Sequence, residues 1–239
     1  MDSKVVSFSA LLGNSEKLQV PVSELVVSVE KILKGMEMKL TDADDYLLKL
    51  IDELTGQCFR MVQPQAGYVV YDDFSVVEQK IRIENKSFDT GKIVASFLKN
   101  SDALVLFSAT CGADIEKYSK ELMKSGHALE GLIVDLVGSE LAESVVDYLH
   151  FQVGSKVGEV DAGVTNRFSP GYCNWPVSDQ QQLFDLLKGN QSGIHLTPSS
   201  LMIPVKSVSG MIGIGYSVKR VEYKCQICDN KKCILRKIE

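Results

Sequence analysis

The stretch RFSPGYCNWPVSDQ, residues 167–180, combines an arginine, a tyrosine five residues later, two prolines and the only tryptophan of the chain. The prolines and the glycine restrict the backbone, so the segment can hold Arg167 and Tyr172 at low entropic cost. A guanidinium is a planar fork suited to a carboxylate or phosphate, and tyrosine adds an aromatic face with a hydroxyl. The stretch is either a loop that holds a ligand or a Pro-Gly surface turn, and its spacing alone favours the turn.

The end of this stretch predicts the start of a helix. Ser178 with Gln181 three residues later has the pattern of a capping box, and leucines follow at helical spacing. Further on, HLTPSSLMIPVKSVSGMIGIGYSV (195–218) contains two prolines and several β-branched residues. This composition indicates short strands joined by tight turns.

Upstream, helical and strand patterns follow one another without a repeated βαβ unit. Apolar spacing predicts helices at 23–35 and 41–56, and GYVVY with SVVEQKIRI (67–83) predicts a β-hairpin. SDALVLFSAT (101–110) has the continuous apolar run of a buried strand, and segment 127–154 predicts a long central helix. We therefore expect an α+β fold with a mixed or antiparallel sheet and a long central helix.

Composition narrows the classes of function. The 239 residues are 45% apolar and 24% charged with a net charge of −5, so the chain lacks the basic footprint of a nucleic-acid binder. No run approaches the roughly 18 apolar residues of a membrane span, and the first residues lack the pattern of a signal peptide. The sequence predicts a cytoplasmic protein that binds neither nucleic acid nor membrane.

Glu143, on the predicted central helix, is a second candidate site residue. Asp147 lies four residues further on, so helix geometry places both carboxylates in one acidic patch. An isolated helical glutamate usually belongs to a solvated face, so this pattern alone assigns no ligand. Gly213 and Gly215 would let a backbone approach a ligand closely, but they lack the strand–turn–helix context of a dinucleotide fingerprint.

Two gapped motifs and one helix resemble the C-terminal reactivation domain of cobalamin-dependent methionine synthase. That family carries an R-x-x-P-G-Y loop with a proline four residues after the tyrosine, an L-T-x-S-x-x-M-x-P-x-x-S-V-S-G segment and an L-A-E-x-x-x-x-Y-L-H helix. This chain has these motifs at 167–176, 196–210 and 141–150. The resemblance is good from about residue 100 to 218 and poor before 90, and TCGADIE and VGSELAE look like the shorter, stand-alone members.

The resemblance implies a methionine synthase activation domain-like fold that binds S-adenosylmethionine. Arg167 would then bind the methionine carboxylate, Glu143 would face its ammonium, and Tyr172 would line the pocket close to the docked corrin. Tyr216 could supply a further aromatic wall. The family also uses an aspartate from its N-terminal part, and no motif in residues 1–90 matches it.

The reaction implied by the resemblance is reductive methylation. Cob(I)alamin is occasionally oxidised to inactive cob(II)alamin, and methyl transfer from S-adenosylmethionine traps the small population that a flavodoxin-like reductant regenerates. This step needs positioning rather than acid–base residues, so the three histidines look incidental. A stand-alone domain implies a partner in trans, either a corrinoid-binding methionine synthase or another corrinoid protein, docked through a transient interface. The chain would be a component of a vitamin B12-dependent methyltransferase of methionine biosynthesis.

The expected organisation is one compact unit with three parts. These are N-terminal helices and a hairpin at 1–90, the S-adenosylmethionine-binding reactivation core at 91–218, and a basic, cysteine-rich tail at 219–239. The tail has three thiols with C-x₂-C-x₄-C spacing: Cys225, Cys228 and Cys233. Such thiols could ligate zinc or an iron–sulfur cluster, but four ligands are the norm. The remaining cysteines could supply the fourth ligand: Cys58, Cys111 and Cys173.

Two other functions remain open at this point. The chain could be a non-catalytic docking or regulatory module that acts through a metal-binding tail. It could also be an S-adenosylmethionine-dependent methyltransferase with an acceptor other than a corrinoid. The motifs do not name the corrinoid partner, the electron donor or the oligomeric state.

Overall fold

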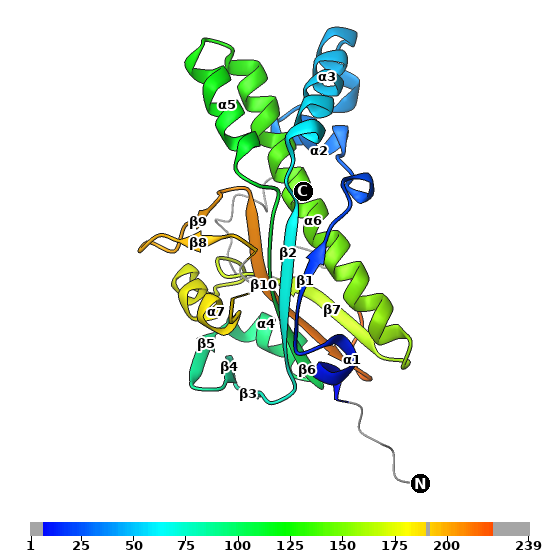
Figure 1. Ribbon diagram of the computed structural model, residues 1–239, viewed down its shortest axis with the longest axis vertical. Coiled ribbons are helices and arrows are strands. Elements are labelled where there is room, and N and C mark those ends of the chain that lie inside the picture. Colours follow the sequence, from blue (N-terminus) through cyan, green and yellow to red (C-terminus); the bar gives the residue numbers. More distant parts are fainter. Residues whose placement is uncertain (1–6, 190–191, 222–239) are drawn as a thin grey trace.

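A computed structural model describes residues 7–189 and 192–221 of the chain. Its centre is a five-stranded sheet in which every neighbouring pair of strands is antiparallel (Figure 1). In sheet order the strands are β1 (Ser15–Gln19), β2 (Gln65–Tyr71), β6 (Ala103–Thr110), β10 (Ser207–Gly215) and β7 (Gly163–Phe168). The expected α+β fold with an antiparallel sheet is thereby confirmed.

The long helix α6 (Ala128–Gly158) packs along one face of this sheet, against β2, β6, β7 and β10. Leucine, isoleucine and valine side chains at helical spacing bury its inner surface, as the apolar pattern of 127–154 predicts. The first half of α6 continues beyond the sheet and packs with other helices into a projection that we call the helical end (Figure 1). These helices are α2 (Val29–Gly35), α3 (Asp45–Met61) and α5 (Asp114–Lys124).

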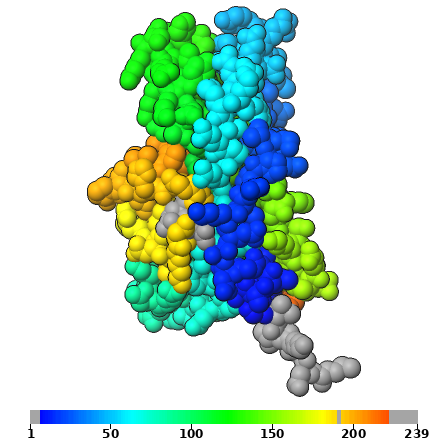
Figure 2. Space-filling model, in the orientation of Figure 1, coloured from blue at the N-terminus to red at the C-terminus, as the bar shows by residue number. Residues whose placement is uncertain are grey.

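The opposite face of the sheet carries a second apolar core. It is covered by a small three-stranded sheet and two short helices, and a two-stranded hairpin projects from the same side (Figures 1 and 2). These elements are β3 (Ser75–Val77), β4 (Lys80–Ile83), β5 (Lys86–Asp89), α4 (Gly91–Leu98), α7 (Gln180–Leu186), β8 (His195–Leu196) and β9 (Met202–Ile203). The remaining elements are α1 (Phe8–Leu12) and the 3-10 turns η1 (Val22–Glu24), η2 (Leu40–Asp42) and η3 (Val177–Asp179).

The two cores explain the continuous apolar run in β6. Val105 and Phe107 face the α6 side of the sheet, whereas Leu104 and Leu106 face the core on the other side. Successive side chains of a strand point to opposite faces, so a strand covered on both faces is apolar at every position. None of the helices in the described ranges is long and apolar enough to cross a bilayer.

Three local predictions were wrong. The predicted hairpin at 67–83 does not form, because β2 pairs with β1 and β6 whereas β3 pairs with β4 in the other sheet. The helix predicted at 23–35 begins only at Val29, because η1 occupies the first residues and the Ser28 hydroxyl caps α2. The second predicted helix continues past Gly56 to Met61.

The boundary expected at residue 90 falls between β5 and α4. Strands β1 and β2 come from the first 90 residues and extend the same sheet as β6 and β10. Tyr68 and Val70 of β2 lie in the core under α6. The N-terminal part therefore contributes strands to the central sheet and side chains to the core under α6.

Candidate functional site

Arg167 lies on β7, the edge strand of the central sheet, where it is paired with Ile212 of β10. Its guanidinium reaches the neighbouring surface of α6. Nη2 lies 3.0 Å from Oε2 of Glu143, and Nη1 donates to Oδ1 of Asp147. The two acids are one helical turn apart, so the acidic patch that helix spacing predicts is real and faces the predicted arginine.

This triad is partly open to solvent and carries an excess of negative charge. The exposed fraction of the side chain is 20% for Arg167, 44% for Glu143 and 54% for Asp147. Burial raises the pKa of Glu143, and the charge of Asp147 adds to this effect while that of Arg167 opposes it. A cation and surplus carboxylates at one accessible place suit a ligand that carries both a carboxylate and an ammonium group.

His150 lies one turn beyond Asp147 and is buried. Its Nε2 donates a hydrogen bond to the carbonyl of Thr165 on β7, at 2.9 Å. Burial, helped by the positive charges of Arg167 and Arg220, lowers the pKa of His150 to about 4. The imidazole is therefore neutral at physiological pH and ties α6 to the edge strand.

The loop after β7 is anchored by Trp175. The indole is buried and packs edge-on against Phe88 of β5, with ring centroids 6.1 Å apart. Its Nε1 donates to Oδ2 of Asp179 at 3.0 Å, and the same oxygen accepts the backbone N–H of Asp89 at 3.2 Å. One carboxylate thus ties the loop to the three-stranded sheet.

The loop backbone closes into a tight turn. Gly171 N donates to Trp175 O, and Trp175 N donates to Tyr172 O, both at 2.8 Å. Gly171, Cys173 and Asn174 have positive φ angles of 98°, 52° and 68°. The turn leaves Tyr172 half exposed on its outside. The segment is thus a rigid turn that also presents an aromatic side chain, so the two readings of the sequence are compatible.

The helix after this loop starts differently from the prediction. Pro176 leads into the 3-10 turn η3, and no side-chain hydrogen bond caps it. Gln181 instead donates its side-chain amide to the carbonyl of Thr197, at 2.8 Å. The predicted capping box is therefore absent, because Gln181 serves to hold the segment before β9.

The second tyrosine of the prediction, Tyr216, lies elsewhere. It follows β10, whose last residue, Gly215, pairs with Gly163 at the beginning of β7. Its ring packs on Phe8 with centroids 5.6 Å apart, and its backbone N–H donates to Asp102. The structure brings Arg167 together with Glu143, places Tyr172 on the adjoining loop, and leaves Tyr216 at the opposite end of β7.

The glycines of β10 are enclosed by the chain itself. A Cβ atom on Gly213 would lie 2.0 Å from Oγ of Ser101, and one on Gly215 would lie 2.4 Å from Oδ2 of Asp102. The close approach that these glycines predict is thus made by the segment before β6 and not by a ligand.

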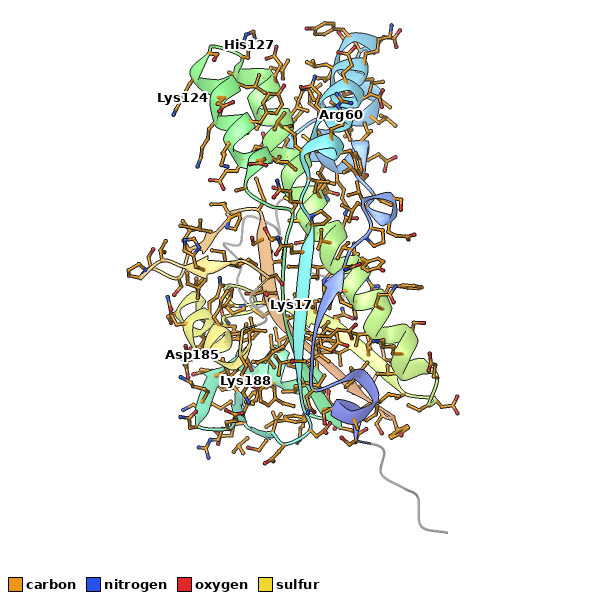
Figure 3. The ribbon with its side chains drawn as sticks, in the orientation of Figure 1. Lys17, Arg60, Lys124, His127, Asp185 and Lys188 are labelled. Carbon is orange, nitrogen blue, oxygen red and sulfur yellow. The ribbon has the colours of Figure 1, made fainter. Side chains whose placement is uncertain are left out.

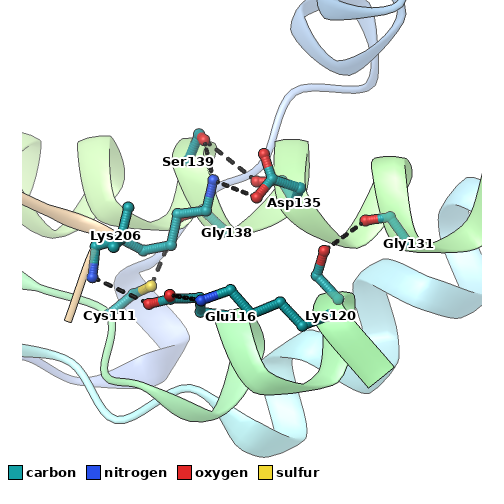
Figure 4. A network of polar contacts seen from close by, with 10 residues as sticks. Cys111, Glu116, Lys120, Gly131, Asp135, Gly138, Ser139 and Lys206 are labelled. Carbon is teal, nitrogen blue, oxygen red and sulfur yellow. Dashed lines mark hydrogen bonds and ion pairs between the residues drawn. The ribbon is translucent and has the colours of Figure 1, made fainter. Parts of the chain in front are cut away.

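Lys206 is a charged residue that the sequence reading passed over. It precedes β10 and is buried, and its ammonium lies 2.8 Å from Oδ1 of Asp135 and 2.9 Å from Oγ of Ser139, both on α6 (Figure 4). Close by, Glu116 of α5 accepts the backbone N–H of Val205 at 3.1 Å. These contacts join the start of β10 to the helical end. A lysine inside a motif of strand residues was the available signal.

Two open clefts flank Asp147 on the surface of α6. One has a volume of about 390 Å³ and is lined by Glu24, Val26, Ser28, Lys31, Glu140, Ser144, Asp147, Tyr148 and Phe151. The other has a volume of about 490 Å³ and is lined by Asp147, His150, Phe151, Gly154, Ser155, Val164 and Arg220. Asp147 and Phe151 line both clefts.

The proposed metal ligands of the tail lie outside the described residues: Cys225, Cys228 and Cys233. Within 7–189 and 192–221, no group of three or more histidine, cysteine or acidic side chains could hold a metal ion. Cys58 and Cys111 are buried, and burial raises the pKa of each thiol to about 12. A metal ligand must be a thiolate, so these two are poor candidates for a fourth ligand.

The structure is similar to a crystal structure of the MetH reactivation domain bound to AdoHcy, with a TM-score of 0.57. The match covers 83% of this chain and 78% of that chain at 15% sequence identity, so it concerns the fold. A family model described as the vitamin B12 dependent methionine synthase activation domain matches residues 42–231, which include α6, β7 and the loop around Trp175. This chain therefore belongs to the family of vitamin B12 dependent methionine synthase activation domains.

Proposed function

We propose that the chain binds S-adenosylmethionine and supports the reductive methylation of cob(II)alamin carried by a separate corrinoid protein. The observation that carries this proposal is the pairing of Arg167 with Glu143 at the sheet edge, in a chain of this family. The solved relative binds AdoHcy, which is S-adenosylmethionine without its transferable methyl group.

Arg167 and Glu143 have the charges that the amino-acid end of this ligand requires. A guanidinium binds a carboxylate through two parallel N–H groups, and a neighbouring carboxylate accepts hydrogen bonds from an ammonium. Glu143 and Arg167 come from different elements, α6 and β7, which fixes the distance between the two subsites. Tyr172 would line the adenosyl or methyl end, because its loop continues directly from β7.

The chain contributes position rather than proton transfer. When bound, S-adenosylmethionine supplies the methyl group and the reduced corrin supplies the electron pair that accepts it. Arg167 and Glu143 would hold the ligand by its amino-acid end, and the turn anchored by Trp175 would keep Tyr172 at a fixed place. Such orientation lowers the barrier of a bimolecular transfer without an acid or a base.

The corrinoid partner and the electron donor belong to the same proposal. The loop after β7 leaves about half of two apolar side chains exposed, 50% for Tyr172 and 49% for Val177. An exposed aromatic residue on a rigid turn suits contact with a second macromolecule. A flavodoxin-like protein would supply the electron, and the interface with the corrinoid protein would be transient.

The first test is calorimetric titration of the protein with S-adenosylmethionine. We expect Arg167→Ala to weaken binding by about 10- to 100-fold, because a hydrogen-bonded charge is lost. Arg60→Ala is the matched control, since Arg60 is exposed on α3 in the helical end (Figure 3). Absence of binding by the wild type at millimolar ligand would contradict the proposal.

The second test separates a corrinoid acceptor from any other. A corrinoid protein loaded with cob(II)alamin is mixed with this protein, a reductant and S-adenosylmethionine, and methylcobalamin is followed by its absorbance. We expect methylcobalamin to form only when all four components are present. Ligand binding without methylation of any corrinoid protein would favour a different acceptor.

A further inference from the structure

Arg167 has one more carboxylate partner than the proposed function uses. Glu143 is assigned to the ammonium of the ligand, whereas Asp147 has no part in binding. Nevertheless Asp147 is in contact with Nη1 of Arg167, while Glu143 contacts Nη2. Each terminal nitrogen of the guanidinium is thus already paired with a carboxylate.

A ligand carboxylate cannot simply be added to this arrangement. The two acids use one N–H group on each terminal nitrogen and leave three of the five N–H groups of the guanidinium, so charge rather than a shortage of donors opposes a third carboxylate. The triad contains one arginine and two carboxyl groups, and this surplus of acidic groups disfavours an approaching carboxylate. Displacement of one acid from Arg167 removes this opposition.

Asp147 is the acid that can leave. Its side chain is the more exposed of the two, 54% against 44% for Glu143. It lines both open clefts on α6, and Glu143 lines neither. Each cleft also contains a cation to which a released aspartate can turn, Lys31 in one and Arg220 in the other.

We propose that Asp147 is an internal stand-in for the carboxylate of the ligand: it occupies Arg167 in the free protein, and ligand binding displaces it. This inference rests on the proposed function, because it concerns the same arginine. Asp147 thereby lowers the affinity of the site and keeps Nη1 of Arg167 paired while no ligand is bound. It also favours ligands whose carboxylate binds Arg167 better than an exposed aspartate does.

The test compares three single-charge variants by calorimetric titration with S-adenosylmethionine. We expect Asp147→Asn to bind about two- to fivefold more tightly than the wild type, because a competing exposed ion pair is removed. Glu143→Gln should bind more weakly, because the ammonium loses its partner. Glu159→Gln is the matched control, since it removes the same charge at the far end of α6, about 18 Å along the helix from Asp147.

Several outcomes would overturn the inference. Unchanged or weaker binding by Asp147→Asn would do so, as would an equal gain with Glu159→Gln, which would indicate a general effect of charge. If Asp147→Asn and Asp147→Ala both unfold, the residue is structural and the inference fails. If neither the wild type nor Asp147→Asn binds, the proposed function fails as well, whereas binding by the wild type alone leaves that function standing.

Discussion

Two basic side chains reach α6 from the sheet, and they do so in opposite ways. Lys206 is buried, with 10% of its side chain exposed, and its partners are one carboxylate and one hydroxyl. Arg167 is twice as exposed, and two carboxylates compete for it. In the Lys206 cluster one ammonium is balanced by one carboxylate, as expected for a contact that holds β10 to α6. In the Arg167 cluster two carboxyl groups share one guanidinium beside open clefts, as expected for a ligand site.

The largest expected effect concerns the Lys206 joint. We expect Lys206→Met to lower the free energy of unfolding by about 2–3 kcal/mol, because the buried stem is retained but Asp135 and Ser139 lose their partner. Denaturant unfolding measures this loss, and the affinity for S-adenosylmethionine should be unchanged.

Lys124→Ala is the control for this variant. Lys124 is an exposed lysine in the last turn of α5, in the same helical end (Figure 3). Its loss should change the free energy of unfolding by less than about 0.5 kcal/mol. A loss of unfolding free energy below about 1 kcal/mol for Lys206→Met would mean that the Lys206 cluster stabilises the fold no more than a partly exposed ion pair such as that of Arg167.

The pH dependence of unfolding tests whether His150, which lies close to Arg167, stabilises the fold. Its pKa is lowered from 6.5 to about 4, so the unfolded chain binds a proton that the folded imidazole does not. The stability that depends on neutral His150 is therefore fully present above pH 6.5, and it is lost as the pH falls from 6.5 towards 4. We expect the wild type to lose about 2 kcal/mol more than His150→Gln between pH 7 and pH 5.

The comparison with His150→Gln cancels the titration of the carboxylates, which both proteins share. Unfolding free energies from denaturant titrations at each pH give the two curves. Parallel curves would mean that protonation of His150 is no more costly in the folded protein than in the unfolded chain.

The sequence predicts the fold better in its core than at its edge. Strand β6 and helix α6 were recognisable because both are buried along their length and therefore have continuous or periodic apolar patterns. Strand β7, GVTNRF, was not predicted, since an edge strand with polar residues lacks both patterns. The false hairpin at 67–83 arose because pairing partners such as β2 and β6 are distant in the sequence.

In the candidate site, too, contacts within one helix could be predicted and contacts between distant segments could not. Helix spacing alone put Glu143 and Asp147 side by side, and the structure confirms that proximity. Their contact with Arg167 depends on the fold, because Glu143 and Arg167 are 24 positions apart in the sequence. For Lys206 the sequence offers only the signal of a lysine inside a motif of strand residues, and its contacts with Asp135 and Ser139 depend on the fold.

The smallest expected effect is the stability of Arg167→Ala. Both ion pairs are partly exposed, so their loss, with the repulsion left between Glu143 and Asp147, should cost less than about 1 kcal/mol of unfolding free energy. The same variant should lose most of its ligand affinity, whereas Lys206→Met should do the reverse. A loss above about 2 kcal/mol for Arg167→Ala would make the arginine a structural joint like Lys206. A small loss of unfolding free energy together with impaired binding indicates instead that Arg167 serves the ligand rather than the stability of the fold.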